Sequence, residues 1–404
     1  MLNEKGEREL AYVAQITDIR PIEGYDRVEL VVVNDGWTCV VGKGQFEVGD
    51  LAAYFEIDSK LPARPPFSDN EFIKKKKYKI TTQKMCKSIS QGLIMSAADF
   101  GGLFYQDRDG KLYFCINGKH FVKGDFLTQE LGVTYATTED NMRKRAPRVN
   151  KYAKMAQRNP ELAKTALWKF MYKSQLGKDI LFMFFGRKKD KAAWPAWVVK
   201  TDEERIQNMP WILSDKEPWI VTEKIDGTST TFTVHKRKHS KKYDFYVCSR
   251  NVVFDTDDKK CFYEENYYTK MAKQYKMQDI LTKIAEEGGY KWVTIQGETF
   301  GNPIQKRTYH RMDQDFLAFN FITDREGRWN SVKAKEFLER KGVYWVPILD
   351  TNFILPDTLE EMLEYANGES ILDFGMREGV VLRSQDGTKS FKTVSNEYLL
   401  KFHG

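Results

Sequence analysis

The sequence predicts a multidomain α+β protein with three parts: a small N-terminal β-barrel, a basic helical connector, and a C-terminal mixed α/β domain with antiparallel sheets. Three observations predict it. Short β-branched runs fill the chain before residue 133, lysines and arginines gather in its middle, and strand-like and helix-like patterns alternate after residue 194. We place the parts at residues 1–133, 134–193 and 194–404.

The composition is that of a globular protein, and a length of 404 residues favours two or three domains. Apolar residues make up 41% of the chain, which is enough for packed cores. Five cysteines without a C-x-x-C pair suggest neither a disulfide framework nor a zinc cluster. The charged start is not a signal peptide, and no apolar run is long enough to span a membrane. We therefore expect an intracellular protein, cytoplasmic or in a nucleoid or nucleus and not secreted, with no membrane as partner.

The N-terminal part has the strand spacing of a small barrel or sandwich. Strand-like runs at 11–19, 28–33, 37–41 and 51–57 are separated by turn residues, and a second group follows at 78–82, 91–95 and 112–116. The basic cluster of Lys74 to Lys77 with Lys79 is either a charged edge strand or a phosphate contact. An OB-like barrel fits best, because that fold combines small size, β content and nucleic-acid grooves.

The connector is the basic part of the chain. Residues 141–200 hold 16 lysines and arginines against three acids, so this block carries +13 and the rest of the chain −6. The segment 162–171 has apolar residues at helical spacing, and Pro147 and Pro160 divide the block. The charge indicates either a polyanionic partner or a solvated helical face.

The C-terminal part alternates strands and helices. Strands are expected at 243–248, 291–296, 315–322, 343–349, 379–383 and 388–393. One or two helices are expected within 264–287, another from Ser331 to Gly342, and a last one at 359–365. Together these patterns predict a mixed α/β domain.

The motif Lys224-Ile225-Asp226-Gly227 stands between two strand-like runs, where Gly227 allows a tight turn. A lysine becomes a nucleophile only when it is deprotonated, so its site must lower its pKa by desolvation or nearby positive charge. The alternative is a surface hairpin with a solvated lysine, and the tetrapeptide alone does not exclude it.

The C-terminal part resembles the lysine nucleotidyltransferase superfamily, which comprises ATP-dependent DNA and RNA ligases and mRNA capping enzymes. Six motifs carry the resemblance in the family's order and spacing: Glu223-Lys224-Ile225-Asp226-Gly227, Ser249-Arg250-Asn251, Gly297-Glu298-Thr299-Phe300-Gly301, Phe316-Leu317-Ala318-Phe319-Asn320, Glu378-Gly379-Val380-Val381 and Ser390-Phe391-Lys392.

The chain is similar to one subgroup above all, the ATP-dependent RNA ligases with an N-terminal OB domain like those of Deinococcus and Naegleria. The segments 20–24, 26–30, 48–50, 54–58 and 200–208 carry this likeness, which covers nearly the whole chain outside the basic block. Asn320 stands where the family has an aspartate. Val394 replaces the second lysine of the last motif, and Lys401 is the candidate to take that lysine's place.

The resemblance implies a role for each motif residue. Lys224 would attack the α-phosphorus of ATP to form lysyl-AMP, Glu298 would accept hydrogen bonds from the ribose, and Phe319 would stack on adenine unless it is an ordinary core residue. Glu378, with Asp226 behind it, would bind Mg²⁺ or Mn²⁺, because Mg²⁺ keeps several waters and few protein ligands. The remaining candidates would bind the nucleotide or neutralise its phosphates, and Lys392 would also lower the pKa of Lys224: Lys200, Glu223, Arg250, Lys392 and Lys401.

The expected function is that of an ATP-dependent RNA ligase in RNA repair. It would join 3′-OH and 5′-phosphate RNA ends, in a nicked duplex or single strands, through lysyl-AMP and AMP-capped RNA. We expect a monomer. The alternatives are a DNA ligase, an mRNA capping guanylyltransferase, and a non-enzymatic OB protein that binds RNA.

Overall fold

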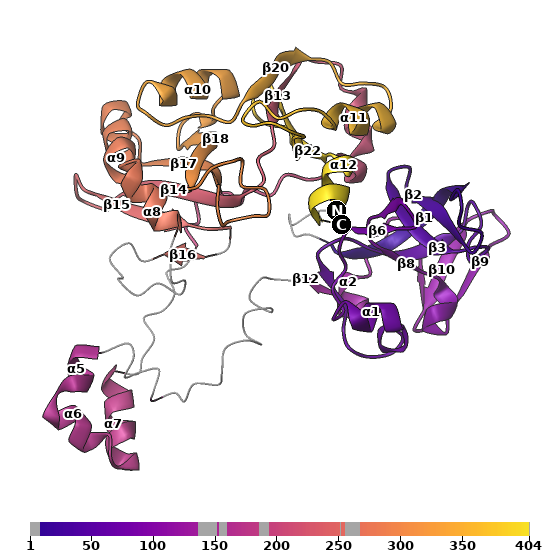
Figure 1. The fold of residues 1–404 in the computed structure, drawn as a ribbon, viewed down its shortest axis with the longest axis horizontal. Helices are drawn as coiled ribbons and strands as arrows, with labels where there is room; N and C mark the ends of the chain where they lie inside the picture. Colours follow the sequence, from indigo (N-terminus) through magenta and orange to yellow (C-terminus); the bar gives the residue numbers. More distant parts are fainter. Residues whose placement is uncertain are drawn as a thin grey trace.

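The computed structural model describes residues 9–135, 152, 160–185, 194–250, 252–254 and 267–403. Figure 1 shows three parts in sequence order: a β-rich N-terminal part, a group of short helices, and a C-terminal part with two large sheets. The order and type of these parts are those expected from the sequence. Among the residues that the structure describes, no helix is long and apolar enough to cross a membrane.

The N-terminal part is built on a five-stranded sheet in the order β3-β2-β1-β4-β8. Strand β1 (Ala11–Pro21) is long enough to pair with β4 (Leu51–Phe55) through its first half and with β2 (Val28–Val33) through its second. An irregularity at Thr17 bends β1 between the two pairings, which curls the sheet. The backbone N–H of Gln91, just before β8 (Leu93–Met95), donates to the carbonyl of Thr38 in β3 (Trp37–Gly42) at 2.7 Å, so the barrel is nearly closed.

Smaller elements complete the barrel. The hairpin of β6 (Gln83–Met85) and β7 (Ser88–Ser90) and the sheet of β9 (Leu103–Gln106), β10 (Leu112–Ile116) and β11 (Lys119–Phe121) stand beside the main sheet. Two apolar clusters lie inside the N-terminal part, one of them around Tyr12, Trp37 and Tyr54. The short pieces are β5 (Ser59–Lys60), η1 (Phe67–Asp69), η2 (Ala97–Phe100), α2 (Thr128–Leu131) and β12 (Thr134–Tyr135).

One predicted strand is absent from this part. Residues 78–82 contain only an isolated bridge at Lys79, because Lys77 and Tyr78 both adopt positive φ and turn the chain. The lysines 74–77 lie at the end of helix α1 (Glu71–Lys75) and in that turn, so they do not form an edge strand. The turn at Lys77 and Tyr78 therefore overrides the strand expected at 78–82.

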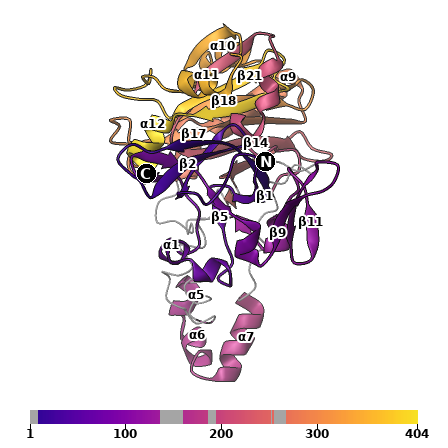
Figure 2. The same ribbon diagram turned by 90° about the vertical axis from the view of Figure 1, so that its right-hand side faces the viewer.

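The middle part consists of three short helices, α5 (Pro160–Lys164), α6 (Ala166–Met171) and α7 (Gln175–Phe185). The segment 162–171, expected as one helix, is divided at Thr165, whose hydroxyl caps α6 by accepting the N–H of Trp168. Trp168 and Leu181 form its small core. Figures 1 and 2 show these helices apart from the two larger parts.

The C-terminal part has two antiparallel sheets. The six-stranded sheet runs β16-β15-β14-β17-β18-β19 and the four-stranded sheet β20-β13-β21-β22. The bounds in the first are β14 (Thr228–Lys236), β15 (Tyr243–Cys248), β16 (Val253–Phe254), β17 (Trp292–Phe300), β18 (Asp315–Thr323) and β19 (Gly327–Arg328). Those in the second are β13 (Trp219–Glu223), β20 (Ile348–Phe353), β21 (Gly379–Ser384) and β22 (Ser390–Val394).

Helices cover these sheets through apolar faces. Helices α8 (Tyr267–Gln274), α9 (Met277–Gly288) and α10 (Ser331–Glu339) contribute to the core of the six-stranded sheet, and α11 (Leu359–Ala366) to that of the four-stranded sheet. The chain ends in α12 (Asn396–Tyr398) and the π-helical turn Leu399–His403. The strand expected at 343–349 begins only at Ile348, because Val346 and its neighbours bridge instead to Ala318.

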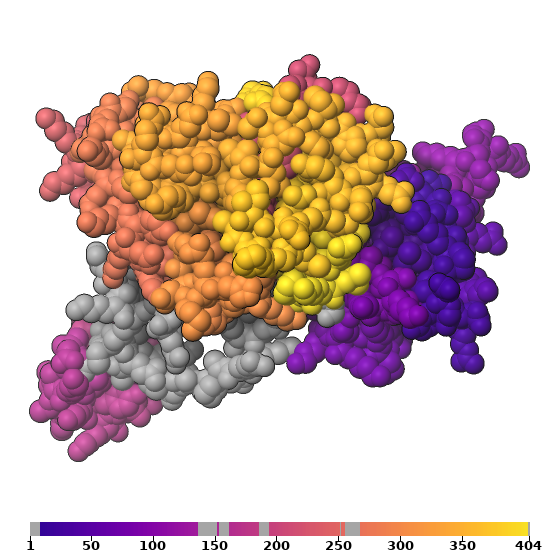
Figure 3. Space-filling view, turned by 45° about the horizontal axis from the view of Figure 1, so that its top comes forward, coloured from indigo at the N-terminus to yellow at the C-terminus, as the bar shows by residue number. Residues whose placement is uncertain are grey.

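The segment 202–214, with the short helices Ile206–Asn208 and Pro210–Ser214, joins the barrel to the C-terminal part. Buried Asn208 accepts the indole N–H of Trp37 at 3.0 Å and donates to the carboxylates of Glu56 at 2.9 Å and Glu204 at 2.6 Å. A Cβ on Gly36 would lie 2.6 Å from Leu359, so the two parts approach closely. Figure 3 shows the barrel, in indigo, directly against the yellow end of the chain.

Candidate active site

The lysine of the 224–227 motif lies where the chain passes from one sheet to the other. Strand β13, buried along its whole length, ends at Glu223 in the four-stranded sheet, and β14 starts at Thr228 in the six-stranded sheet. The backbone N–H of Lys224 donates to the carbonyl of Gly379 at 3.0 Å. Gly227 allows the crossing, because a Cβ there would lie 2.4 Å from the carbonyl oxygen of Thr299.

Lys224 is surrounded by carboxylates. Its Nζ lies 2.6 Å from Oε2 of Glu378, and both side chains are largely buried. Burial lowers the pKa of Lys224, but the negative charges of Glu378, Glu298 and Asp226 outweigh burial and raise that pKa overall. The site as it stands therefore holds the lysine protonated, whereas the sequence argument required a lowered pKa.

Glu298, in β17, is the carboxyl group whose protonation is most affected by this site. Burial raises its pKa to about 8, while the charge of Lys224 acts in the opposite direction. The neighbouring Gly297 is required by close packing, because a Cβ there would lie 2.3 Å from the carbonyl oxygen of Leu317. This carboxyl group therefore loses its proton only around pH 8, and its negative charge acts on Lys224 once that proton is lost.

The carboxylate of Asp226 lies behind the lysine and is held by tyrosines. The hydroxyl of Tyr398 donates to Oδ2 of Asp226 at 2.7 Å, and that of Tyr309 accepts the backbone N–H of Asp226 at 2.7 Å. Arg307 is buried against both rings, 4.5 Å from the centroid of Tyr309 and 5.8 Å from that of Tyr398. Asp226 is thus fixed in position by Tyr309 from a loop and Tyr398 from helix α12, both far from it in sequence.

Glu378 is the main candidate ligand for a divalent cation. Within the described residues no group of three or more histidine, cysteine, aspartate or glutamate side chains is placed to hold an ion. Mg²⁺ and Mn²⁺ sites need fewer protein ligands, because water and phosphate oxygens complete the coordination. Glu378 fits a cation of this kind, and Glu298 is close enough for the charge of Glu378 to raise its pKa.

The two predicted phosphate-binding cations meet on Asp202. Arg250 forms an ion pair with Oδ2 of this aspartate and lies over the ring of Tyr135, and Nζ of Lys392 lies 3.7 Å from its Oδ1. The backbone N–H of Lys392 donates to the carbonyl of Glu204 at 2.8 Å. The segment that contacts the barrel therefore also positions both cations.

The other predicted ligand residues differ in their surroundings. Phe319 is the extra residue of a bulge in β18, between the pairs Gln296–Asn320 and Gly297–Ala318, and the guanidinium of Arg383 lies 5.8 Å from its ring. The carboxylate of Glu223 is buried and accepts from the hydroxyl of Ser370 at 2.5 Å and the N–H of Ile371 at 2.9 Å. Lys200 and Lys401 are exposed, the latter over the ring of Phe402.

Sequence reasoning missed Asp202, Arg307, Tyr309 and Tyr398 as parts of this site. Asp202 lies in the segment 200–208, which carries part of the resemblance to the RNA ligases. That position was a signal that could have marked it as a candidate. The other three have no short motif, and only the fold brings them to Asp226. Asn251 of the second motif lies outside the described residues.

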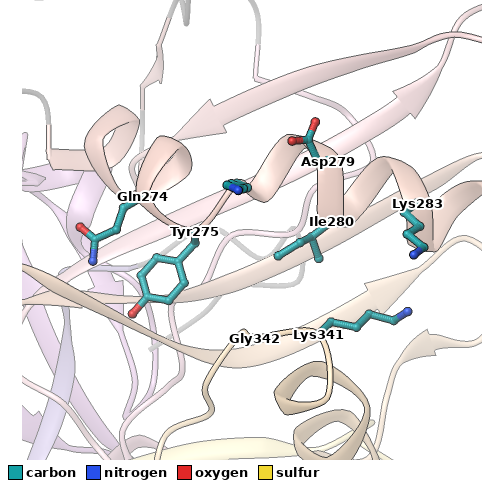
Figure 4. A pocket seen from close by; sticks show the side chains of 8 residues that line it. Gln274, Tyr275, Asp279, Ile280, Lys283, Lys341 and Gly342 are labelled. Atoms are coloured by element: carbon teal, nitrogen blue, oxygen red, sulfur yellow. The ribbon is translucent and has the colours of Figure 1, made fainter.

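A separate surface pocket lies at the junction of α8 and α9, opposite Lys341 and Gly342. Figure 4 shows Tyr275 and Ile280 of the helical side facing this loop. The lining includes none of the predicted site residues. The candidate site is therefore defined by the contacts of Lys224 and not by this hollow.

The structure thus places a largely buried lysine beside Glu378 at the seam of two antiparallel sheets, in a part of the chain that follows a small barrel. Residues 217–402 match the model of the RNA ligase family, and residues 10–97 match that of an OB-fold domain. The chain therefore carries an RNA ligase domain behind an OB-fold domain, which confirms the resemblance stated from the motifs.

Solved structures of an RNA ligase from Naegleria gruberi are similar along nearly the whole chain. The structure with PPi is 26% identical at a TM-score of 0.67, covering 98% of this chain and 99% of that one. A variant of the same enzyme with ATP and Mn is also 26% identical at a TM-score of 0.67, covering 98% of this chain and 100% of that one. No curated protein matches the chain.

Proposed function

We propose that the protein is an ATP-dependent RNA ligase that joins 3′-OH and 5′-phosphate RNA ends. Lys224 would attack the α-phosphorus of ATP and release pyrophosphate, the AMP would pass to the RNA 5′-phosphate, and the 3′-OH would then displace it. The observation that carries the proposal is the position of Lys224 at the sheet seam, 2.6 Å from Glu378, inside a domain that matches RNA ligases. The similar Naegleria enzyme was solved with ATP and Mn and with AMP and Mn.

The chain's own residues divide the work. Glu378, with Asp226 held behind it, would bind the metal ion, which when bound supplies positive charge to the phosphates and to Glu378. Glu298 would bind the ribose. Phe319, the bulge residue of β18 with Arg383 beside its ring, would contact the adenine. Glu223 would hold the 370–371 loop beside the nucleotide. Arg250 and Lys392, now paired with Asp202, would turn to phosphate groups, where positioning and charge neutralisation matter most. Lys200 and Lys401 would reach the nucleotide from the rim.

Deprotonation of Lys224 would depend on what joins the site. The carboxylates raise its pKa, so a cation that neutralises Glu378 removes one cause of that shift. We infer that the unliganded enzyme stores the lysine as an ion pair. Binding of nucleotide and metal would release the amine for attack.

The decisive experiment is labelling of the protein with α-labelled ATP and a divalent metal ion, followed by denaturing electrophoresis. We expect a retained label in the native protein and none in Lys224→Ala or in Lys224→Arg, since an arginine stays protonated. Lys224→Ala should still seal RNA whose 5′ end already carries AMP, because that step needs no amine nucleophile. A label retained by Lys224→Ala would overturn the assignment, and labelling by GTP instead of ATP would favour a capping enzyme.

A further inference from the structure

The helices α5–α7 carry more large apolar side chains on their outside than inside. Their core consists of Trp168 and Leu181 with partly buried neighbours. The five most exposed of the apolar side chains, which we call the apolar face, are Leu167 at 71%, Phe170 at 75%, Leu176 at 72%, Met183 at 59% and Phe184 at 68% exposure. Single exposed apolar residues are ordinary, but a set of this size on 26 residues indicates a contact surface.

The members of the apolar face follow the helical repeat. Leu167 and Phe170 are three residues apart on α6, and Leu176 and Met183 are seven apart on α7, with Phe184 beside them. Gly177 of α7 packs inward, where a Cβ would lie 2.0 Å from the carbonyl oxygen of Met171, and buried Leu181 lies one turn further along the same side. Leu176 and Met183 therefore point away from the packed side, and Phe184 follows them near the end of the helix.

The apolar face belongs to a basic stretch of the sequence. Residues 160–185 contain four lysines against Glu161 and Asp179, and Glu161 is already paired with Lys164 at 2.9 Å. In the sequence before them, residues 141–159 hold seven lysines and arginines and no acid, and residues 186–193 after them hold four against one. Figures 1 and 2 show that neither larger part of the molecule covers these helices.

We propose that the apolar face docks on an anionic lipid surface, with α6 and α7 lying in the membrane interface. An amphipathic helical surface with leucine and phenylalanine on one side and lysines around it binds this way, through buried apolar area and attraction to acidic headgroups. Bound RNA accounts for the charge, but its phosphates gain nothing from exposed Leu167, Leu176 and Met183. A second copy would bring two strongly basic segments together, which opposes association.

This inference does not rest on the proposed ligase activity, and it replaces the expectation that no membrane is a partner. That expectation depended on the lack of an apolar run long enough to span a bilayer. A surface contact needs no such run, because the helices lie along the interface.

The test is flotation of the full-length protein with vesicles of phosphatidylcholine alone or mixed with phosphatidylglycerol. We expect binding to the mixed vesicles only, weakened but not abolished by salt. The double variant Phe170→Ser with Phe184→Ser should bind at least about tenfold more weakly, because it removes two exposed aromatic anchors. The matched control is Leu103→Ser with Phe126→Ser, which removes two exposed apolar side chains from the barrel and should float like the native protein.

Circular dichroism of each variant and labelling by ATP in the same preparations separate lost docking from lost folding or activity. Absence of flotation with mixed vesicles at low salt would overturn the proposal, as would equal flotation of the native protein and the Phe170/Phe184 variant. A variant that floats normally but loses RNA in filter binding would show that the apolar face serves RNA. A native dimer that this variant dissociates, without any vesicle binding, would show that the face joins two copies.

Discussion

At the residue scale, the contact between Lys224 and Glu378 affects both deprotonation of the lysine and binding of a metal ion, and these two requirements oppose each other. The ion pair keeps the lysine in place but protonated, and the same carboxylate is the candidate metal ligand. Removing its charge should make the amine easier to deprotonate while weakening the metal site. Which effect dominates decides what Glu378 does.

We expect the metal requirement to dominate in Glu378→Gln. The change removes charge but keeps shape, so labelling by ATP should fall by about tenfold or more, as for loss of a metal ligand or its support, and recover partly with more Mg²⁺ or with Mn²⁺. The measurement is the metal dependence of lysyl-AMP formation, with thermal unfolding to verify the fold. Full activity of this variant at low Mg²⁺ would assign Glu378 a structural role.

The acidic surroundings of Lys224 also predict a pH dependence. The lysine's pKa is raised, and only the neutral amine attacks, so the rate of lysyl-AMP formation should increase with pH above neutrality. Glu298→Gln removes one of the negative charges that raise this pKa, so the rising limb should shift to lower pH even if the maximal rate is lower. The pH profiles of both proteins measure this, with Glu339→Gln, at an ion pair on α10, as control. Coincident limbs for all three would show that Glu298 does not act on the lysine.

Arg307 is a third residue-scale case, because it is buried beside the Tyr309 and Tyr398 rings that hold Asp226. Among the described residues neither terminal guanidinium nitrogen has a hydrogen-bond partner, so the stabilisation that the structure shows for this cation comes from the ring faces and the charge of Glu223. Its place could not be read from the sequence, where it is an ordinary basic residue in a loop.

At the scale of elements, the passage from β13 to β14 depends on the absence of a side chain at Gly227. A Cβ would meet the backbone of β17 at 2.4 Å, which only a shift of the strands relieves. We expect Gly227→Ala to destabilise the protein by about 1–3 kcal/mol, as overpacking does, and to abolish labelling by ATP. Thermal unfolding and labelling measure the two effects. Gly42→Ala, where the nearest atom is 3.7 Å away, is the control, and equal behaviour of both variants would contradict this account.

Much of the C-terminal part was predictable because its motifs lie in or beside apolar, strand-like runs. Lys224 directly follows β13, Glu298 and Phe319 lie within β17 and β18, and Glu378 directly precedes β21. The bulge that singles out Phe319 and the turn at Lys77 and Tyr78 depend on backbone geometry that the residue pattern does not encode. Tertiary contacts also moved the start of β20 from residue 343 to Ile348. The support of Asp226 by Tyr309 and Tyr398 arises only when a distant loop and helix α12 meet beside it.

At the scale of the whole molecule, the barrel touches the catalytic part through the same segment that holds the phosphate-binding candidates. Asn208 links Trp37 and Glu56 of the barrel to Glu204, and the carbonyl of Glu204 accepts the N–H of Lys392. Asp202, two residues earlier in the chain, pairs with Arg250 and Lys392. The barrel can therefore affect the positions of Arg250 and Lys392 through this segment, in addition to any contact it makes with RNA.

This coupling predicts the effect of Asn208→Ala. The variant removes a buried amide that serves three groups, so it should cost about 1–3 kcal/mol of stability by the usual penalty for unpaired buried polar groups. We expect both ATP labelling and sealing of AMP-capped RNA to decline, because Lys392 and Asp202 lose their support. Asn117→Ala removes an exposed amide from Glu130, far along the barrel from this contact in sequence, and should change neither step.

Salt separates this positioning role from RNA binding. RNA affinity rests largely on phosphate contacts and falls as the salt concentration rises. The hydrogen bonds of Asn208 are buried, so salt weakens them little. In the native protein, sealing should therefore decline with salt more steeply than labelling does, while the defect of Asn208→Ala in labelling should persist at every salt concentration. If Asn208→Ala labels normally and fails only in sealing, the barrel acts on the RNA alone. If both steps survive unchanged, the Asn208 contact holds the two parts together without serving either reaction.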